Sequence, residues 1–480
     1  MEVEARRLEE FRRLREEIRG SQEHLIVGID VAKETHNAFL GTATGETLYK
    51  RLIFENTLEG FEKLLVQVEA VRVQRGLKRV VFGVEPTANY HKPLGEFLIE
   101  RNHAVVLVAT DAVKKNRSLL DGRWDKHDGK DCANVADLIS QGKCLYYEHP
   151  SPELRELRNL LSFKRKLKKL EHGLRMRIRN HLVAQYFPEM DQSCNWGEHE
   201  GLALVRWCLD PAVVSGLGMD EFLSRLHTQG RNLSQRRRLR AVWENASTSI
   251  GCRFSPSVEF EAQMLVKLLK EMRQTLADTD DKIREVCVKF SEYPCLLSIP
   301  GFGPALSAMV LGAIGNPWRF SNGAQVLKMV GLDLSASRSG KYSAQGTASI
   351  SKKGKAELRY AMYQAALIAS SRDKHFIVYF TNQLRGREKE KGIKTKKRVK
   401  LAAKMLIIAW TLMKRKQLFD PKYLRLDSTI SELAGLKTAA PEKGGGCQGS
   451  YPARIVAYKP NAEVALGQIE SVFAKRRVKM

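Results

Sequence analysis

The chain has 480 residues, enough for two or three domains that each bury a core of their own. Its hydrophobic fraction of 43% is ordinary for a globular protein and argues against intrinsic disorder. Lys and Arg number 80 against 54 for Asp and Glu, and this net charge of +26 predicts a polyanionic partner, above all nucleic acid. Composition alone leaves open a basic soluble protein such as a ribosome-associated factor.

Membrane, secreted and zinc-binding classes find no support in the sequence. The most apolar stretch, LAAKMLIIAWTLMKRK from Leu401, is interrupted by Lys404 and is too short to span a bilayer. The N-terminus is charged from its second residue and lacks an apolar signal core. Eight cysteines are scattered without a C-x-x-C pair. We therefore expect a cytoplasmic protein with no membrane partner.

The first 145 residues predict a charged helix followed by an α/β domain. Residues 1 to about 22 have the composition of one charged helix. From His24, the runs HLIVGID, THNAFLGT and TLYKRLIF predict three antiparallel strands. A helical stretch, the strand RVVFGVE, a helix from His91 to Arg101 and the strand HAVVLVAT follow in a β-α-β pattern. This order predicts an α/β sheet with helices packed on it.

Two long helices are predicted in the middle of the chain. The first runs from Pro152 to about His181 and is strongly basic, with a leucine stripe; the second runs from Val258 to Phe290. We expect the two to pack as an antiparallel hairpin or as a dimerising coiled coil. Plain packing within one domain is the alternative. The insert between them, residues 191–255, has no assigned role.

A third domain begins near Ser298 and extends to about Leu418. Its opening, PGFGPALSA, resembles the hairpin of a helix-hairpin-helix, in which Gly301 and Gly303 would let backbone N–H groups approach a DNA phosphate. A tight turn between two core helices is the alternative. Beyond this domain, the turn-rich segment TAAPEKGGGCQGSYPA predicts a flexible tail.

Carboxylates at two strand ends and on one helix form a candidate metal site. Asp30 ends HLIVGID and Glu85 ends RVVFGVE, and an acid at the end of a buried strand is costly unless it is paired or metal-bound. Hard cations such as Mg²⁺ prefer oxygen ligands, so the set predicts phosphoryl chemistry on nucleic acid. The stretch WDKHDGKDCAN places three aspartates on one helix face at steps of three, and spacing alone does not rank them: Asp125, Asp128 and Asp131.

A polar stretch rich in Ser and Gly lies between two helical segments of the third domain. Ser339 precedes Gly340, and a hydroxyl among cations that hold a phosphate can act as a nucleophile toward DNA. The alternative is a phosphate-binding loop in which Ser339 only donates a hydrogen bond. No histidine lies in this stretch, so a Ser-His triad is not indicated. The surrounding cations are Arg338, Lys341, Lys352, Lys353, Lys355 and Arg359.

These motifs occur together and in a fixed order in one known family. Along the chain they are GIDVAKETH, GVEPTANYH, KHDGKDCANVADL, RIRNHLVAQYFPE, SIPGFGPAL and RSGKYS…ISKKGKAELR. On these motifs the chain resembles the DEDD transposases of the insertion sequence 110 family, which are bridge-RNA-guided DNA recombinases. The resemblance runs from about His24 to Leu418.

The resemblance implies an α/β RNase H-like (RuvC-like) domain, then a coiled-coil region and a mainly α-helical transposase domain. The implied partners are the element-end and target DNA, a structured guide RNA and further copies of the chain, as a dimer or tetramer. The implied location is prokaryotic, cytoplasmic and nucleoid-associated. The implied divisions are the charged helix 1–22, the catalytic domain 23–145, the long-helix region with its insert 146–292, the serine transposase domain 293–420 and the tail 421–480.

Carried over residue by residue, the resemblance assigns catalysis to four acids and one serine. The family's K-T-D-x-x-D-A pattern falls on residues 126–132 and selects Asp128 over Asp125. The acids that would hold Mg²⁺ or Mn²⁺ are Asp30, Glu85, Asp128 and Asp131. The implied nucleophile is Ser339, with Ser337 and Ser335 as close alternatives.

Two positions depart from the family pattern, because Ala88 stands where members usually have Gly and Cys132 where they usually have Ala. The implied reaction is strand exchange through a covalent phosphoserine link. Two other functions stay open: a RuvC-type metal-dependent DNA nuclease in which water attacks, and a non-catalytic structured-RNA-binding protein whose acids are relics. Neither of these uses the Ser-Gly loop.

Overall fold

The computed structural model describes residues 2–120, 128–193, 199–226, 233–335 and 349–424. The N-terminal part is built around a six-stranded sheet with strand order β3-β2-β1-β4-β5-β6. The first three strands are antiparallel, β1, β4 and β5 run parallel, and β6 returns antiparallel to β5. The strands are β1 (His24–Asp30), β2 (Thr35–Thr42), β3 (Thr47–Glu55), β4 (Arg79–Val84), β5 (Ala104–Leu107) and β6 (Leu145–Tyr146). This mixed sheet with flanking helices fits the predicted RNase H-like domain.

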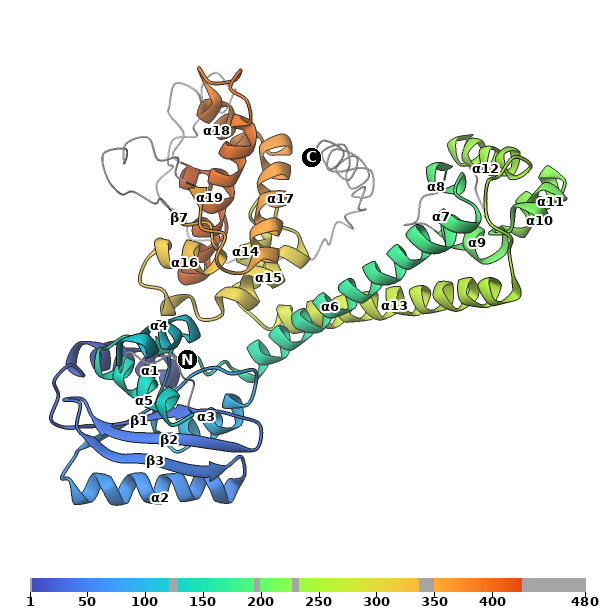
Figure 1. The fold of residues 1–480 in the computed structure, drawn as a ribbon. Helices are drawn as coiled ribbons and strands as arrows, with labels where there is room; N and C mark the ends of the chain where they lie inside the picture. The colour runs from blue at the N-terminus through green and yellow to red at the C-terminus, as the bar shows by residue number, and fades with distance from the viewer. Residues whose placement is uncertain (1, 121–127, 194–198, 227–232, 336–348, 425–480) are drawn as a thin grey trace. The chain divides into compact units, whose positions relative to one another are not determined.

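Helices cover both faces of this sheet (Figure 1). Because strand residues alternate between faces, Leu25, Val27 and Ile29 join one core while Ile26 joins the other. The first core includes α2 (Leu58–Gln74) and α3 (His91–Glu100). The second includes α1 (Glu2–Glu17), α4 (Thr110–Leu120) and α5 (Asp128–Ser140). The charged N-terminal helix therefore packs onto the sheet through its apolar side.

Gly28 allows α5 to lie directly on β1. A Cβ at this position would stand 2.2 Å from the backbone oxygen of Cys132 and 2.6 Å from the backbone nitrogen of Ala136. Any side chain would therefore push the helix off the strand. Gly83 on β4 has the same role further along, because its Cβ would meet the side chain of Ile139.

The two predicted long helices are present and run side by side (Figure 1). They are α6 (Pro152–Arg177) and α13 (Pro256–Val288). Their ion pairs connect early α6 to late α13 and late α6 to early α13, so the pair is antiparallel within one chain; the pairs are Lys164–Asp280, Glu171–Arg273 and Arg177–Glu261. Dimerisation through this pair stays a prediction.

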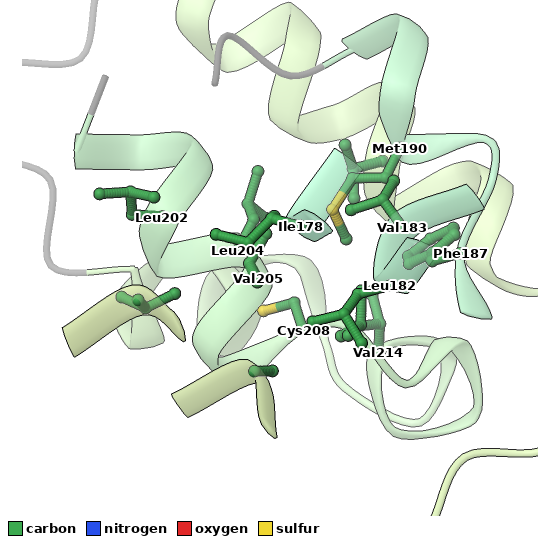
Figure 2. Close-up of a cluster of buried hydrophobic side chains, with 14 of the residues drawn as sticks. Ile178, Leu182, Val183, Phe187, Met190, Leu202, Leu204, Val205, Cys208 and Val214 are labelled. Atoms are coloured by element: carbon green, nitrogen blue, oxygen red, sulfur yellow. The ribbon is translucent and has the colours of Figure 1, made fainter. Parts of the chain in front are cut away.

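The insert folds around a core that it shares with the adjoining ends of α6 and α13. Figure 2 shows this core, in which Ile178, Leu182 and Phe187 meet Val205, Cys208 and Val214. The helix continues from α6 through the π-helical turn Ile178–Val183, whose flanking residues Arg177 and Ala184 both have right-handed helical backbones. The helices are α7 (Ala184–Tyr186), α8 (Met190–Ser193), α9 (His199–Trp207), α10 (Pro211–Ser215), α11 (Met219–Arg225) and α12 (Leu233–Ala246).

The last part is mainly helical, as predicted. No described helix is long and apolar enough to cross a membrane. The helices are α14 (Tyr293–Leu297), α15 (Pro304–Ile314), α16 (Gly323–Val330), α17 (Ala356–Arg372), α18 (Lys374–Leu384) and α19 (Ile393–Arg415), with 3₁₀ turns η2 (Pro317–Arg319) and η4 (Pro421–Leu424). A two-stranded ribbon, β7 (Leu334–Ser335) and β8 (Ser349–Ile350), interrupts them.

Candidate active site

The structure places Asp30 and Glu85 next to each other at the carboxyl ends of two parallel strands. Ile29 pairs with Val84, and the Glu85 N–H lies 3.4 Å from the Ile29 carbonyl oxygen, so each acid directly follows a paired residue. Both acids are half-buried. Because Gly28 and Gly83 face α5, alternation directs Asp30 and Glu85 to the same face. The carboxyl ends of strands are the edge where α/β sheets build sites.

The beginning of helix α5 lies close to this edge of the sheet. Burial raises the pKa of the Cys132 thiol to about 12, and the nearby negative charge of Asp30 adds to the increase. Asp30 therefore lies close to the beginning of α5. The backbone of Asp128 begins this helix one turn before Cys132, while its side chain and all of Asp125 lie outside the described residues.

Asp131 is buried and ion-paired, with only 3% of the residue exposed. The Arg117 Nε donates to its Oδ1 at 2.8 Å, and Arg117 Nη2 lies 2.6 Å from the same oxygen. Arg117 comes from α4, which packs on α5 through a further polar network around Asn116. Sequence reasoning missed Arg117, because nothing in its spacing indicates that α4 faces α5.

Asn37 is a second residue that sequence reasoning missed. It lies directly opposite Asp30 in the antiparallel β1–β2 pair, so the two side chains share a face. Only 8% of Asn37 is exposed, and its Oδ1 accepts a hydrogen bond of 3.1 Å from Arg51 Nε. The sequence did contain an indication of this position. In the GIDVAKETHN stretch, the strand after Asp30 is expected to return antiparallel to β1, which places Asn37 near Asp30.

The described residues fit a divalent metal in part. Asp30 and Glu85 offer carboxylate oxygens, the donors that hard cations prefer. No three His, Cys, Asp or Glu side chains within the described ranges lie close enough to hold an ion together. Of the other two predicted ligands, Asp131 is held by Arg117 and Asp128 is described only by its backbone.

The Ser-Gly loop starts and ends at a fixed base. Leu334 pairs with Ile350 and Ser335 with Ser349, so β7 and β8 hold the two ends of the loop together. The Ser351 N–H donates to the Asp333 carbonyl at 2.8 Å just below this ribbon. Four of the predicted residues, Ser337, Arg338, Ser339 and Lys341, lie outside the described residues.

The cations after the loop divide into exposed and structural ones. Lys352 and Lys353 are exposed, and Lys352 has a left-handed backbone with φ 57°. Arg359 uses Nη1 to bind the carbonyl oxygens of Val330 at 2.8 Å and Lys352 at 3.2 Å, which joins the end of α16 to the ISKKG segment. At least one of its nitrogens is therefore structural rather than free for a phosphate.

Lys355 stands next to a cluster in which cations outnumber acids. Glu148 accepts from Arg158 at 2.9 Å and from Arg319 at 2.6 Å. Desolvation of the ammonium and the charges of these two arginines lower the pKa of Lys355 to about 8. The residue as a whole stays more than one-third exposed, so the ammonium is crowded by cations rather than enclosed. A phosphate would relieve this crowding.

The two glycines of the hairpin-like turn have different surroundings. Gly301 has φ 88°, and a Cβ there would lie 2.6 Å from the Ala365 carbonyl oxygen on α17. Its smallness therefore serves packing within the domain. A Cβ at Gly303 would have no atom of the described residues within 4 Å, apart from those of its two chain neighbours, so its surroundings are open to a ligand. Phosphate binding by the backbone N–H groups of Gly301 and Gly303 stays a prediction.

Comparison with known proteins gives the same order of domains. Residues 27–188 match a family model for DEDD transposases of IS110, described as "Transposase", and residues 293–381 match the transposase IS116/IS110/IS902 family. Together the matched segments make up just over half of the chain. The chain belongs to the IS110 family of transposases. It is therefore a DNA-binding enzyme of DNA recombination, and its DEDD-type domain indicates dependence on a divalent metal.

A curated relative supports the same family over a longer stretch. The transposase is 22% identical over 405 residues to the "Insertion element IS116 uncharacterized 44.8 kDa protein" of Streptomyces clavuligerus. That alignment covers 82% of this chain and 96% of the relative. The family models leave out residues 189–292 and everything after residue 381, so the insert and α19 of this transposase lie outside them.

Proposed function

We propose that this transposase cuts and rejoins DNA strands through a covalent phosphoserine intermediate on Ser339. The observation that carries the proposal is the pair Asp30 and Glu85, on one face and at the carboxyl ends of adjacent parallel strands, beside the beginning of α5. Asp30, Glu85, Asp128 and Asp131 would hold Mg²⁺, with Mn²⁺ as the alternative ion. When bound, the ion would stabilise negative charge that develops on the scissile phosphate.

The chain's own residues would perform the bond exchange. The Ser339 hydroxyl oxygen attacks the scissile phosphorus, the serine–phosphate bond forms, and the bond to the leaving DNA oxygen breaks. The serine proton is lost, and the leaving oxygen gains a proton to become a strand-end hydroxyl. Attack by a strand-end hydroxyl on the phosphoserine then reverses these changes and releases the serine, so rejoining needs no net hydrolysis.

The surroundings of the serine loop support a role next to phosphate. The β7–β8 ribbon fixes both ends of the loop, and the exposed cations Lys352 and Lys353 follow it directly. Arg338, Lys341 and Lys355 would add positive charge, and Gly303 has open space for a phosphate oxygen. The proposal has two further parts. A structured guide RNA would choose the target DNA. The chain would form a dimer or tetramer in which the acids of one copy meet the serine of another.

The test is a denaturing gel with labelled element-end DNA, Mg²⁺ and transposase co-expressed with the non-coding flanks of its element. We expect a labelled band at protein mass that is lost in Ser339→Ala and in Asp128→Asn. Ser337→Ala is the matched control, because it removes a neighbouring hydroxyl and should keep the band. Cut DNA without an adduct, with cutting retained in Ser339→Ala, would instead establish the metal-dependent nuclease.

A further inference from the structure

The exposed face of α19 forms a shallow groove of about 790 Å³. Lys400, Lys404, Thr411 and Arg415 recur at helical spacing along one wall. Tyr379 from α18 and the segment from Asp420 to Lys422 form the other sides. From Lys400 to Arg415 the helix rises about 22 Å, so the groove is long as well as shallow.

Four cations and one acid line this groove. Lys404 donates to the Leu424 carbonyl at 3.1 Å and lies 4.5 Å from the centre of the Tyr379 ring, and Lys422 lies 3.8 Å from Asp420. The cations at the two ends, Lys400 and Arg415, are exposed and have no ion-pair partner among the described residues. Such unneutralised charge along a groove attracts a polyanion.

The positive charge continues beyond the groove into the first turns of α19. Partial desolvation and the charges of Lys400 and Arg387 lower the pKa of Lys397. Lys394 and Lys396 are exposed on the same turns. Several like charges are therefore crowded at one end of the helix, and a row of phosphates would relieve their repulsion.

The floor of the groove is apolar. Ala403, Ile407 and Ile408 line it between the cations, and the ring of Tyr379 stands at its side. A duplex turns its phosphates outward and keeps its bases stacked inside, so it cannot reach this floor with its bases. An unpaired strand can place bases on an apolar or aromatic surface while its phosphates contact cations on the rim.

The chain's own C-terminal segment is a poor occupant. Residues 425–480 carry nine Lys and Arg against five Asp and Glu, so their charge has the same sign as the groove. Thr411 Oγ1 donates to the Ile407 carbonyl at 2.9 Å, so its hydrogen is not available to a ribose 2′-OH. The described lining thus has charge and apolar surface, but little that would select RNA over DNA.

We propose that the α19 groove binds an unpaired DNA strand, with phosphates on Lys400 and Arg415 and bases on the Ala403–Ile408 floor. The choice of DNA rests on the proposed strand exchange, which produces unpaired strand ends. The groove itself is argued only from its lining, and apart from Tyr379 its lining residues lie outside the segments matched by the family models.

The test measures binding by fluorescence anisotropy with full-length transposase carrying Ser339→Ala, in EDTA, so that no strand is cut. The probes are a labelled 20-nucleotide DNA strand, the same sequence as RNA, and the DNA duplex. The groove variants are Lys400→Gln with Arg415→Gln, and separately Ala403→Glu. Lys50→Gln with Lys63→Gln is the matched control, because these exposed lysines of the sheet domain lose the same charge far along the chain.

We expect the double groove variant to bind single-stranded DNA about 10-fold more weakly at 150 mM salt. The slope of log affinity against log salt should fall by about 1.4, since each lost phosphate contact on a single strand removes about 0.7. Ala403→Glu keeps all cations and should weaken single-strand binding more than duplex binding. Thermal melting and circular dichroism check that each variant is folded.

Single-strand affinity and salt slope equal to those of the Lys50/Lys63 control would overturn the proposal. So would equal losses for single strand and duplex, or groove-dependent binding of RNA alone. These outcomes are independent of the adduct experiment. If Ser339 proved not to form the covalent adduct, the affinities measured here would not change. If the groove variants bound DNA as the parent does, the covalent adduct would still be expected to form.

Discussion

Ala88 has a backbone conformation that suits glycine. Its φ of 47° lies in the left-handed region, where a Cβ meets the neighbouring carbonyl oxygen. The residue lies three positions after Glu85, in the turn that leads from β4 into α3. Glycine, the residue expected here from the family resemblance, adopts this conformation without that contact. The departure is thus a local strain next to the candidate site, and the chain tolerates it.

We predict that Ala88→Gly stabilises the sheet domain by about 1 kcal/mol, because it removes the steric cost of the left-handed region. In a domain of this size that corresponds to an increase of about 2–4 °C in the midpoint of thermal unfolding. Ala70→Gly is the opposite control, since Ala70 is exposed within α2 and should lose about 1 kcal/mol. A decrease in both variants would show that the turn at Ala88 is unstrained.

At the scale of elements, the contact between α4 and α5 decides the state of Asp131. The carboxylate is buried and its described partner is Arg117, so a metal that uses Asp131 has to compete with this ion pair. A nearby second connection, from Asn116 to Asn134 and Asp137, holds the same two helices without touching Asp131. The two connections can be separated by substitution.

We predict that Arg117→Ala costs about 3 kcal/mol of stability without metal, because it leaves a buried carboxylate unpaired. Added Mg²⁺ should then raise the melting temperature more than it does in the parent chain, since the freed carboxylate can bind the ion. Asn116→Ala is the control: it loosens the same helix pair and should keep the parent response to Mg²⁺. Equal Mg²⁺ responses in all three would remove Asp131 from the metal ligands.

At the scale of the whole molecule, the sheet domain holds two buried histidines, His24 and His36, and two half-buried ones, His91 and His103. Burial is the largest cause that lowers the pKa of His24, His36, His91 and His103. His36 is fully buried; its Nδ1 accepts from the Ala32 N–H at 3.2 Å, and its Nε2 lies 3.2 Å from Asn56 Oδ1. This arrangement fits a neutral ring that donates from Nε2.

We predict that the sheet domain loses stability as the pH falls below about 6.5, the ordinary histidine value. Below pH 6.5 the histidines of the unfolded chain take up protons, while those of the folded chain resist protonation because their pKa values are lowered. The stability present above pH 6.5 is therefore lost as the pH falls from 6.5 through the pKa values of the folded state. Thermal unfolding of the parent and of His36→Gln between pH 7.5 and 5 measures this. The advantage of the parent should shrink toward pH 5, and a constant difference would contradict the prediction.

Much of this protein could be read from its sequence, because the signals are local. Alternating apolar runs predicted the strands at His24, Thr35 and Thr47, and the two long helices begin and end within a few residues of the expected positions. Asp30 and Glu85 were found because an acid that closes an apolar strand is costly without a partner. Motif order gave the family, which the comparisons confirm.

Other features depend on which surfaces meet, and only the tertiary structure decided them. The Arg117–Asp131 pair exists because α4 packs on α5, and Asn37 stands beside Asp30 because of the β1–β2 register. Gly301 has to be small because the Ala365 carbonyl of α17 lies 2.6 Å from where its Cβ would stand. The sequence by itself determined strands β1 to β5, the two long helices and the order of acids along the chain, since these follow from neighbouring residues. Their partners come from residues far apart in the chain, which only packing brings together.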